Sequence, residues 1–272
     1  MPLKQSEAIV LRSYPLREAD LLVTFFTRAE GKLKGVARAA QKSRKRFGGA
    51  LEPLTTVRLY WEDRERQELA RIDACDVLAS PLTDVVDYGR AVALAHVAEL
   101  LDELLPEREA NDAIFRLAAA VLARLKAGMI WAPITYFELW MVRLTGFLPE
   151  LTVCSLCGAA LDPEPASVKT ARIADEAEWA GTRLSSGPER AFFHPLVDGL
   201  MCAEDRRLAS TELTQESRAI AVRMLRTPVE SFLDRPWKRE CGADLRRFLV
   251  QRIERHTERK LVTSAMLEKL SS

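Results

Sequence analysis

The spacing of apolar residues changes once along this chain, near Pro81, and the change divides the chain into two kinds of segment. Between Ser6 and Ser80, short runs rich in β-branched and aromatic residues are separated by breaks: AIVLRSY, LLVTFFT, GKLKGVARAA, TTVRLYW and ELARIDACDVL. Runs of this length and composition predict strands. Five short strands predict a small closed barrel, an architecture that commonly binds single strands of nucleic acid.

Beyond Pro81 the apolar residues recur at helical spacing, which predicts a mainly α-helical domain. The strongest pattern predicts a helix over Asp112–Lys126, with an Asn/Asp pair to cap its start and Gly128 beyond its end. Another helix is predicted to begin at Pro133 and to end before Gly146. Two further helices are predicted over residues 214–226 and 237–260.

Residues 150–206 separate these helical segments and have weak periodicity, with frequent proline and glycine. We therefore expect an irregular, zinc-finger-like insertion there. The predicted fold class is α+β with two domains. A barrel over residues 1–80 precedes a mainly helical domain over residues 81–272 that contains the insertion.

Composition excludes a membrane protein and favours a cytoplasmic one. Polar residues interrupt the N-terminus, and no run approaches the roughly 18 uncharged apolar residues of a membrane span. Five cysteines, an odd number, predict reduced thiols or metal ligands rather than a disulfide framework. The formal net charge is only +1, so any attraction to nucleic acid must come from local clusters of positive charge.

One such cluster lies between residues 28 and 46, where eight basic residues accompany the single acid Glu30. Alternation along a strand puts one group of cations on a single face, and a second group follows in a loop. Because lysine and arginine bind phosphate oxygens without reading bases, we expect both groups to contact nucleic acid. The face comprises Lys32, Lys34 and Arg38, and the loop comprises Lys42, Arg44, Lys45 and Arg46. A solvated loop that only confers solubility is the alternative.

Aromatic residues in the same region offer surfaces on which bases can stack. The candidates are Tyr14, Phe26, Phe47, Tyr60 and Trp61. In so small a barrel, the alternative for each is a place in the core.

A second cluster has the spacing of a metal site: Cys154 and Cys157 are separated by two residues, as are Cys202 and Asp205 much later in the chain. Two intervening residues let both side chains of a pair reach one ion, and zinc takes four tetrahedral ligands. We expect these four residues to bind zinc, with His194 as the substitute for the atypical Asp205. The alternative is a degenerate knuckle whose cysteines pack without metal.

Catalytic motifs are missing from the sequence, which has only three histidines, no HExxH and no GxxxxGK[ST] phosphate loop. We therefore expect a non-catalytic protein whose cysteines, if they bind metal, are structural.

Three segments, in order along the chain, resemble the bacterial RecO family of recombination mediators: AIVLRSYPLREADLLVTFFTRAEGKLKGVARAAQKSRKRFGGALEP, YFELWMVRLTGFLPELTVCSLCG and FFHPLVDGLMCAED. The resemblance spans nearly the whole chain. It implies an N-terminal OB-fold, a helical C-terminal domain with a zinc knuckle, and a nucleoid-associated role in the repair of DNA damage by recombination.

The same resemblance implies particular activities and partners. Members bind single- and double-stranded DNA, anneal complementary strands and work with RecR. They also recognise the acidic tail of single-stranded-DNA-binding protein, so that RecA can be loaded on coated strands. Candidate rim cations for a tail-binding groove are Arg116, Arg124, Lys126 and Arg143, and a DNA track could continue over Arg246, Arg247, Arg252, Arg255 and Arg259.

The chain departs from the family pattern at two places near the second knuckle. Asp198-Gly199 stands where a glycine pair is usual, and Asp205 replaces a cysteine. Both positions bear on zinc, whereas the basic segment is distant in sequence.

Two other classes of function compete with the DNA-binding hypothesis. One is a protein-interaction adaptor whose basic barrel docks an acidic partner. The other is a zinc-dependent hydrolase in which Asp205 leaves one coordination position open to water.

Overall fold

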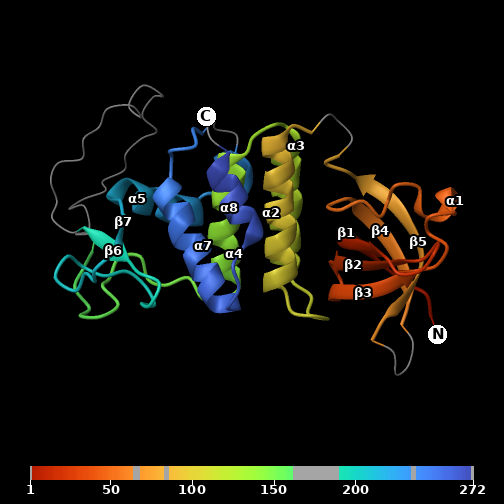
Figure 1. Cartoon of the computed structure of the whole chain (residues 1–272), viewed down its shortest axis with the longest axis horizontal. Helices are drawn as coiled ribbons and strands as arrows, with labels where there is room; N and C mark the ends of the chain where they lie inside the picture. Colours follow the sequence, from red (N-terminus) through yellow and green to blue (C-terminus); the bar gives the residue numbers. More distant parts are fainter. Residues whose placement is uncertain (1, 64–67, 83–85, 162–189, 234–236, 271–272) are drawn as a thin grey trace.

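The computed structural model describes residues 2–63, 68–82, 86–161, 190–233 and 237–270. In Figure 1 a barrel lies at one end, a layer of helices in the middle, and a small knuckle region at the other end. In the described part of the chain, no helix combines the length and apolar character that a membrane crossing requires.

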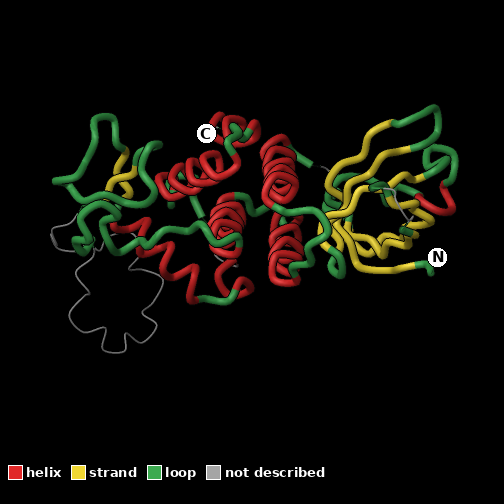
Figure 2. The backbone as a smooth tube through the Cα atoms, turned by 90° about the horizontal axis from the view of Figure 1, so that it is seen from below, coloured by secondary structure: helices red, strands yellow, loops and turns green. Residues whose placement is uncertain are grey.

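The barrel is formed by five strands: β1 (Lys4–Pro15), β2 (Leu21–Thr27), β3 (Gly31–Ala37), β4 (Thr56–Glu62) and β5 (Ala70–Ala79). Their spatial order is β1-β2-β3-β5-β4, and β4 pairs with β1 to close the barrel. Figure 2 shows the strands curving into a ring. All pairs are antiparallel except β3 and β5, which run parallel from Gly35 to Ala37. The predicted closed barrel of OB-fold type is confirmed.

Strand β3 has the predicted alternation. Leu33, Gly35 and Ala37 are buried, while Lys34 is exposed and Lys32 is half-buried. The buried side chains enter a barrel core with Phe25, Leu59, Trp61 and Ile72. One local prediction was wrong: the segment that begins at Lys42 is not all loop, because Arg44–Phe47 forms a single helical turn, α1.

The second domain contains α2 (Tyr88–Leu104), α3 (Asp112–Lys126), α4 (Trp131–Leu144), α5 (Gln215–Arg226), α6 (Val229–Leu233), α7 (Ala243–Thr257) and α8 (Val262–Lys269). The bounds predicted for α3 are confirmed. Its cap is Asn111, whose Oδ1 accepts a hydrogen bond from the Ile114 backbone N–H at 3.0 Å. Such a bond satisfies one of the otherwise unpaired amides of the first turn.

The last predicted helix, over residues 237–260, was too long. Gly242 stands in the left-handed region at the start of α7, and Glu258 adopts φ +54° at its end. A left-handed residue ends the helical hydrogen-bond pattern. The chain then turns into α8, which lies beyond the predicted helix and was not predicted.

The barrel and the helices share an apolar interface. Ile9, Leu11, Phe26 and Leu54 of the barrel join the core of the helical domain rather than that of the barrel. The rings of Phe26 and Phe115 lie 5.6 Å apart. The two domains are therefore packed against each other rather than linked loosely.

The predicted insertion lies partly outside the described residues, which resume at residue 190. Its described part contains β6 (Ala191–Phe193), which pairs with β7 (Thr211–Leu213). The second knuckle loop lies between these two short strands in the chain.

Candidate nucleic-acid interface and metal centre

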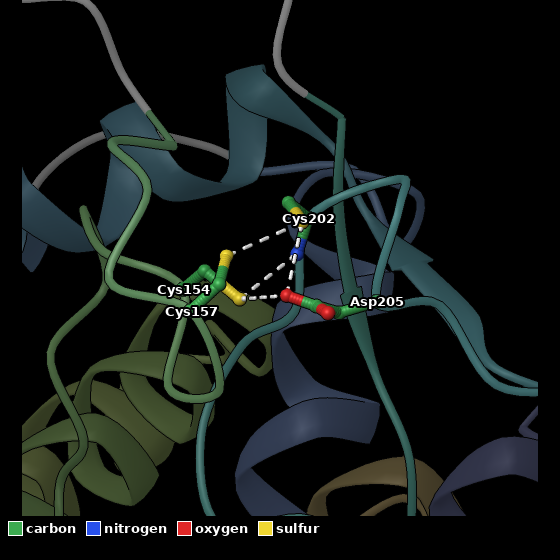
Figure 3. Close-up of side chains that lie close together, drawn as sticks. All are labelled: Cys154, Cys157, Cys202 and Asp205. Carbon is green, nitrogen blue, oxygen red and sulfur yellow. Dashed lines mark hydrogen bonds between the residues drawn. The ribbon is translucent and has the colours of Figure 1, made fainter.

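The four residues predicted to bind metal converge on one point (Figure 3). Cys154 and Cys157 lie in the loop that follows α4, and Cys202 and Asp205 lie in the loop that follows β6. Their ligand atoms all lie within 4.8 Å of one another. The Asp205 Oδ2 is 3.2 Å from the Cys154 Sγ and 3.3 Å from the Cys202 Sγ.

Backbone contacts hold the two loops together. The Ser155 N–H donates to the Leu200 carbonyl at 2.8 Å, which joins the loops, and within the first loop the Gly158 N–H donates to the Cys154 carbonyl at 3.0 Å. Gly199 has φ +120°, and a Cβ there would lie 2.9 Å from the Ser155 Cβ. The close approach of the loops therefore requires glycine at position 199.

The donor set fits zinc. Two thiolates each about 2.3 Å from a tetrahedral zinc ion lie about 3.8 Å apart. The Cys157 Sγ and Cys202 Sγ are separated by 3.8 Å. The substitute ligand, His194, lies outside the cluster, and its Nδ1 accepts the Leu196 N–H at 3.1 Å. Among the described residues, Asp205 rather than His194 occupies the fourth position.

Neighbouring groups in this cluster shift one another's pKa values. Burial opposes ionisation of Cys154, but backbone N–H groups, including that of Cys157, outweigh it and lower the pKa of the Cys154 thiol. The neighbouring Asp205 carboxylate raises the pKa of Cys157 to about 12. Hydrogen bonds from the three thiols lower the pKa of Asp205. A carboxylate and three thiols this close together form an electron-rich group that a divalent cation would stabilise.

Asp198, one of the departures from the family pattern, tethers the knuckle to α7. Its carboxylate lies 2.7 Å from the Arg252 guanidinium and 3.1 Å from that of Arg255. Arg252 is almost fully buried, and Arg246 donates to the Thr135 hydroxyl inside the helical domain. Two arginines of the expected DNA track therefore make internal contacts. Sequence reasoning missed this role because the partners are more than 50 residues apart.

The predicted basic residues are found in several environments. Arg38 and Lys42 are exposed. Arg46 donates to the Arg38 carbonyl and lies over the Phe47 ring, with 5.0 Å from guanidinium carbon to ring centroid. The backbone of Arg44 and Lys45 lies in α1, but their side chains are outside the described part of the structure.

Acidic residues of the helical domain approach the cationic face of β3. The Lys34 ammonium lies 2.5 Å from the Glu107 carboxylate, and the Lys32 ammonium donates to the Asp102 carbonyl at 2.6 Å. The Lys32 side chain is only 12% exposed. These contacts join residues about 70 positions apart, so no local pattern could have predicted them.

Most of the candidate aromatic residues belong to the core. Trp61, Phe26 and Phe47 are each at least 97% buried, and Tyr60 is half-buried. Tyr14 is 51% exposed. It is therefore the candidate best placed to stack on a base.

The fold and these sites together define a class of protein: an OB-fold barrel packed against a helical domain that carries a knuckle able to hold a metal ion. Residues 1–81 match the family model for the N-terminal part of recombination protein O, and residues 86–265 match the model for its C-terminal part.

Individual relatives agree with this match. The chain is 64% identical to the DNA repair protein RecO of Koribacter versatilis (strain Ellin345), over 98% of this chain and 99% of the relative. It is 32% identical to that of Anaeromyxobacter sp. (strain K), over 89% and 93%. It is 33% identical to that of Geobacter sulfurreducens, over 66% and 71%. The chain belongs to the RecO family of DNA repair proteins, as the sequence segments predicted.

Proposed function

We propose that this protein is a recombination mediator that binds single- and double-stranded DNA and acts by positioning strands, without covalent chemistry. The proposed contact surface comprises Lys32, Lys34, Arg38, Lys42, Arg44, Lys45 and Arg46. The observation that carries it is the exposure of Arg38 and Lys42 on an OB-fold barrel, directly before the basic turn α1. Family membership supports the same role.

Annealing follows from the same surface. Phosphate groups on two strands repel each other, and a row of lysines and arginines reduces that repulsion by replacing condensed counterions. Contacts to phosphates leave base edges free to pair. The protein would thus bring complementary strands together without reading their sequence.

To test the contact surface, Lys42, Arg44, Lys45 and Arg46 would all be changed to glutamate. We expect affinity for both forms of DNA to fall at least tenfold while circular dichroism shows an intact fold. The matched control reverses the same number of cations in the helical domain: Lys126, Arg143, Arg207 and Lys238. Equal DNA affinity for the two folded variants would refute the proposal.

A basic barrel that docks an acidic protein remains the second candidate function. The observation in its favour is that carboxylates from the helical domain already pair with cations of the barrel, Glu107 with Lys34 and Asp102 with Arg12. If the four-residue reversal leaves DNA binding intact, this adaptor function would replace the one proposed here.

We also propose that the knuckle binds one zinc ion through Cys154, Cys157, Cys202 and Asp205. Structural zinc sites contribute free energy of folding. Changing Cys154 and Cys157 to alanine should therefore remove one equivalent of zinc and lower the melting temperature. Cys241→Ser, outside the cluster, is the control. A double variant with unchanged zinc content and melting temperature would show a knuckle that packs without metal.

The expected protein partners are RecR, RecA indirectly, and the acidic tail of single-stranded-DNA-binding protein. For the tail we propose a pocket of about 400 Å³ between α3, α4 and the end of α5. Trp140, Leu144 and Leu225 supply apolar surface, and the charged residues that line it in the described structure are Arg116 and Arg226. Arg124, Lys126 and Arg143 do not line it.

An acidic amphipathic peptide would place its apolar side chains in this pocket and its carboxylates on the two arginines. Arg116→Glu with Arg226→Glu should weaken binding of the tail peptide more than tenfold, whereas Lys126→Glu with Arg143→Glu should leave it within twofold. The reverse order would exclude this pocket. We place these activities in the cytoplasm at the nucleoid, and we keep residues 1–80 and 81–272 as the proposed domain division.

A further inference from the structure

A groove of about 630 Å³ is lined by residues of both the barrel and the helical domain. The barrel contributes Arg12, Tyr14, Lys32 and Lys34 to its lining, and the end of α7 contributes His256 and the following Arg259. The groove also receives Asp102 and Glu103 from the last turn of α2. The groove is thus lined by cations that can bind phosphate and by carboxylates that repel it.

The carboxylates are paired with the cations. The Arg12 Nε lies 2.6 Å from the Asp102 Oδ2, and the Arg259 guanidinium lies 3.1 Å from the Glu103 carboxylate. At the rim, the Lys34 ammonium lies 2.5 Å from Glu107. Three carboxylates therefore neutralise most of the charge of four cations.

Backbone contacts hold the segment around Glu107 in register with β3. Strand β3 pairs with β5 only from Gly35 onward, which leaves the edge of its first half open. The Arg108 N–H donates to the Lys32 carbonyl at 3.0 Å on this edge. Gly31 permits the approach, since a Cβ there would lie 2.0 Å from the Glu109 carbonyl oxygen. The fold itself thus brings Glu107 to Lys34.

We propose that this groove is a second site for the phosphate backbone of a single strand, and that Asp102, Glu103 and Glu107 compete with phosphate in cis. The inference rests on the proposed DNA-binding function and extends it to a new surface. A strand that leaves the basic segment of the barrel would enter the groove along Lys34 and continue towards Arg259. Bound phosphates would replace the carboxylates as partners of the cations.

Energetics favour such an exchange for a long polyanion. Lys34 and Glu107 have side-chain exposures of 45% and 57%, and an exposed pair of this kind contributes little to stability. A nucleic-acid strand gains counterion release at each phosphate, whereas an isolated anion does not gain it cumulatively. Lys32 is different, because it is nearly buried and donates to a backbone carbonyl at the end of α2. We therefore expect Lys32 to exchange its present partner for phosphate less readily than Lys34 does.

The test neutralises two of the three acids, Glu103→Gln with Glu107→Gln, and leaves unchanged Asp102, whose carbonyl accepts the hydrogen bond from Lys32. Each freed cation should add about one phosphate contact, so the log-log salt slope for single strands should become steeper by about 1.4. Affinity near 50 mM salt should rise, and the gain should shrink about sevenfold by about 200 mM. Glu212→Gln with Glu216→Gln, at the knuckle end, makes the same change of net charge and is the control.

A double-mutant cycle with Lys34→Gln identifies the competition itself. Because Lys34 belongs to the proposed contact surface, Lys34→Gln should weaken single-strand binding even in the unsubstituted protein, but by a smaller factor than in the Glu107→Gln background, since Glu107 already pairs with this lysine. In the Glu107→Gln background it should abolish the gain. Glu107→Gln alone also guards against misfolding of the double variant, because it removes only an exposed contact.

Three results would overturn the inference. They are an affinity of the acid variants no higher than the control's, an unchanged salt slope, or an equal effect of Lys34→Gln in both backgrounds. These outcomes leave the proposed function standing if the basic turn α1 still governs binding. Absence of DNA binding by the unsubstituted protein would refute both proposals.

Discussion

Tyr14 lines the same groove as Lys34, and half of its surface is exposed. A base stacked on an aromatic ring contributes about 1–3 kcal/mol. Tyr14→Ala should therefore weaken single-strand binding at least fivefold, and duplex binding less, because duplex bases are already stacked. Tyr88→Ala, an exposed tyrosine at the start of α2, is the control. Fluorescence anisotropy with both forms of DNA measures the difference, and equal losses for the two variants would exclude stacking on Tyr14.

Asp198 is the partner of Arg252, whose side chain is 10% exposed. Asp198→Ala leaves a nearly buried guanidinium without its carboxylate, which should lower the free energy of unfolding by about 1–3 kcal/mol. Glu212→Gln, which breaks the exposed pair with Arg190, should change it by less than about 1 kcal/mol. Urea denaturation of both variants checks the ranking. A stability loss no greater for Asp198→Ala would show that the tether to α7 is unimportant.

Features that depend on the spacing of residues along the chain could be predicted from the sequence. Alternation along β3 predicted that Lys34 would face outward and Leu33 inward, and the spacing of the four metal-site residues predicted their convergence. It could not find the contact of Lys32 with α2 or of Asp198 with α7. Those contacts depend on how distant segments pack, and a charge pattern along the chain carries no information about that packing.

Helix α3 begins where its capping residue predicts. Asn111→Ala removes the side-chain acceptor for the Ile114 N–H and should lower the free energy of unfolding by about 0.5–2 kcal/mol. Asn111→Asp keeps an acceptor and adds a negative charge at the helix N-terminus, so it should remain within about 0.5 kcal/mol. Thermal denaturation distinguishes them. If the two variants were equally destabilised, the cap would not be the cause.

Element boundaries were predictable where a residue type dictates them and not elsewhere. Asn111 and Gly128 have strong positional preferences, so the bounds of α3 followed from the sequence. Glu258 ends α7 in a left-handed conformation that glutamate rarely adopts, so the residue type did not predict the end of the helix. The turn α1 was missed for the opposite reason. Four residues are too few to produce a periodic signal.

The two domains are joined by a charge network that should make their association sensitive to pH. Partial burial raises the pKa of Asp63, but hydrogen bonds from Lys4 and Arg108 outweigh it and hold that pKa below its usual value. A carboxyl with a lowered folded-state pKa stabilises the fold above its unfolded pKa, and the contribution is lost as pH falls through the folded pKa.

Asp63→Asn should therefore lose less stability than the unsubstituted protein between about pH 5 and pH 2. Urea denaturation at a series of pH values measures this slope. Asp76→Asn, on β5, serves as the control. Parallel curves for the unsubstituted protein and Asp63→Asn would show that the network contributes nothing to the acid response.

The central proposal is that the protein binds the phosphate backbone of DNA through its cations. A salt titration of strand binding by the full-length protein tests this most directly. If about five phosphates are contacted, log affinity should fall against log salt with a slope of about −3.5 for single strands and about −4.5 for duplex. Reversal of Lys42, Arg44, Lys45 and Arg46 should flatten both slopes. Salt-independent binding, or no binding near 50 mM salt, would contradict the account.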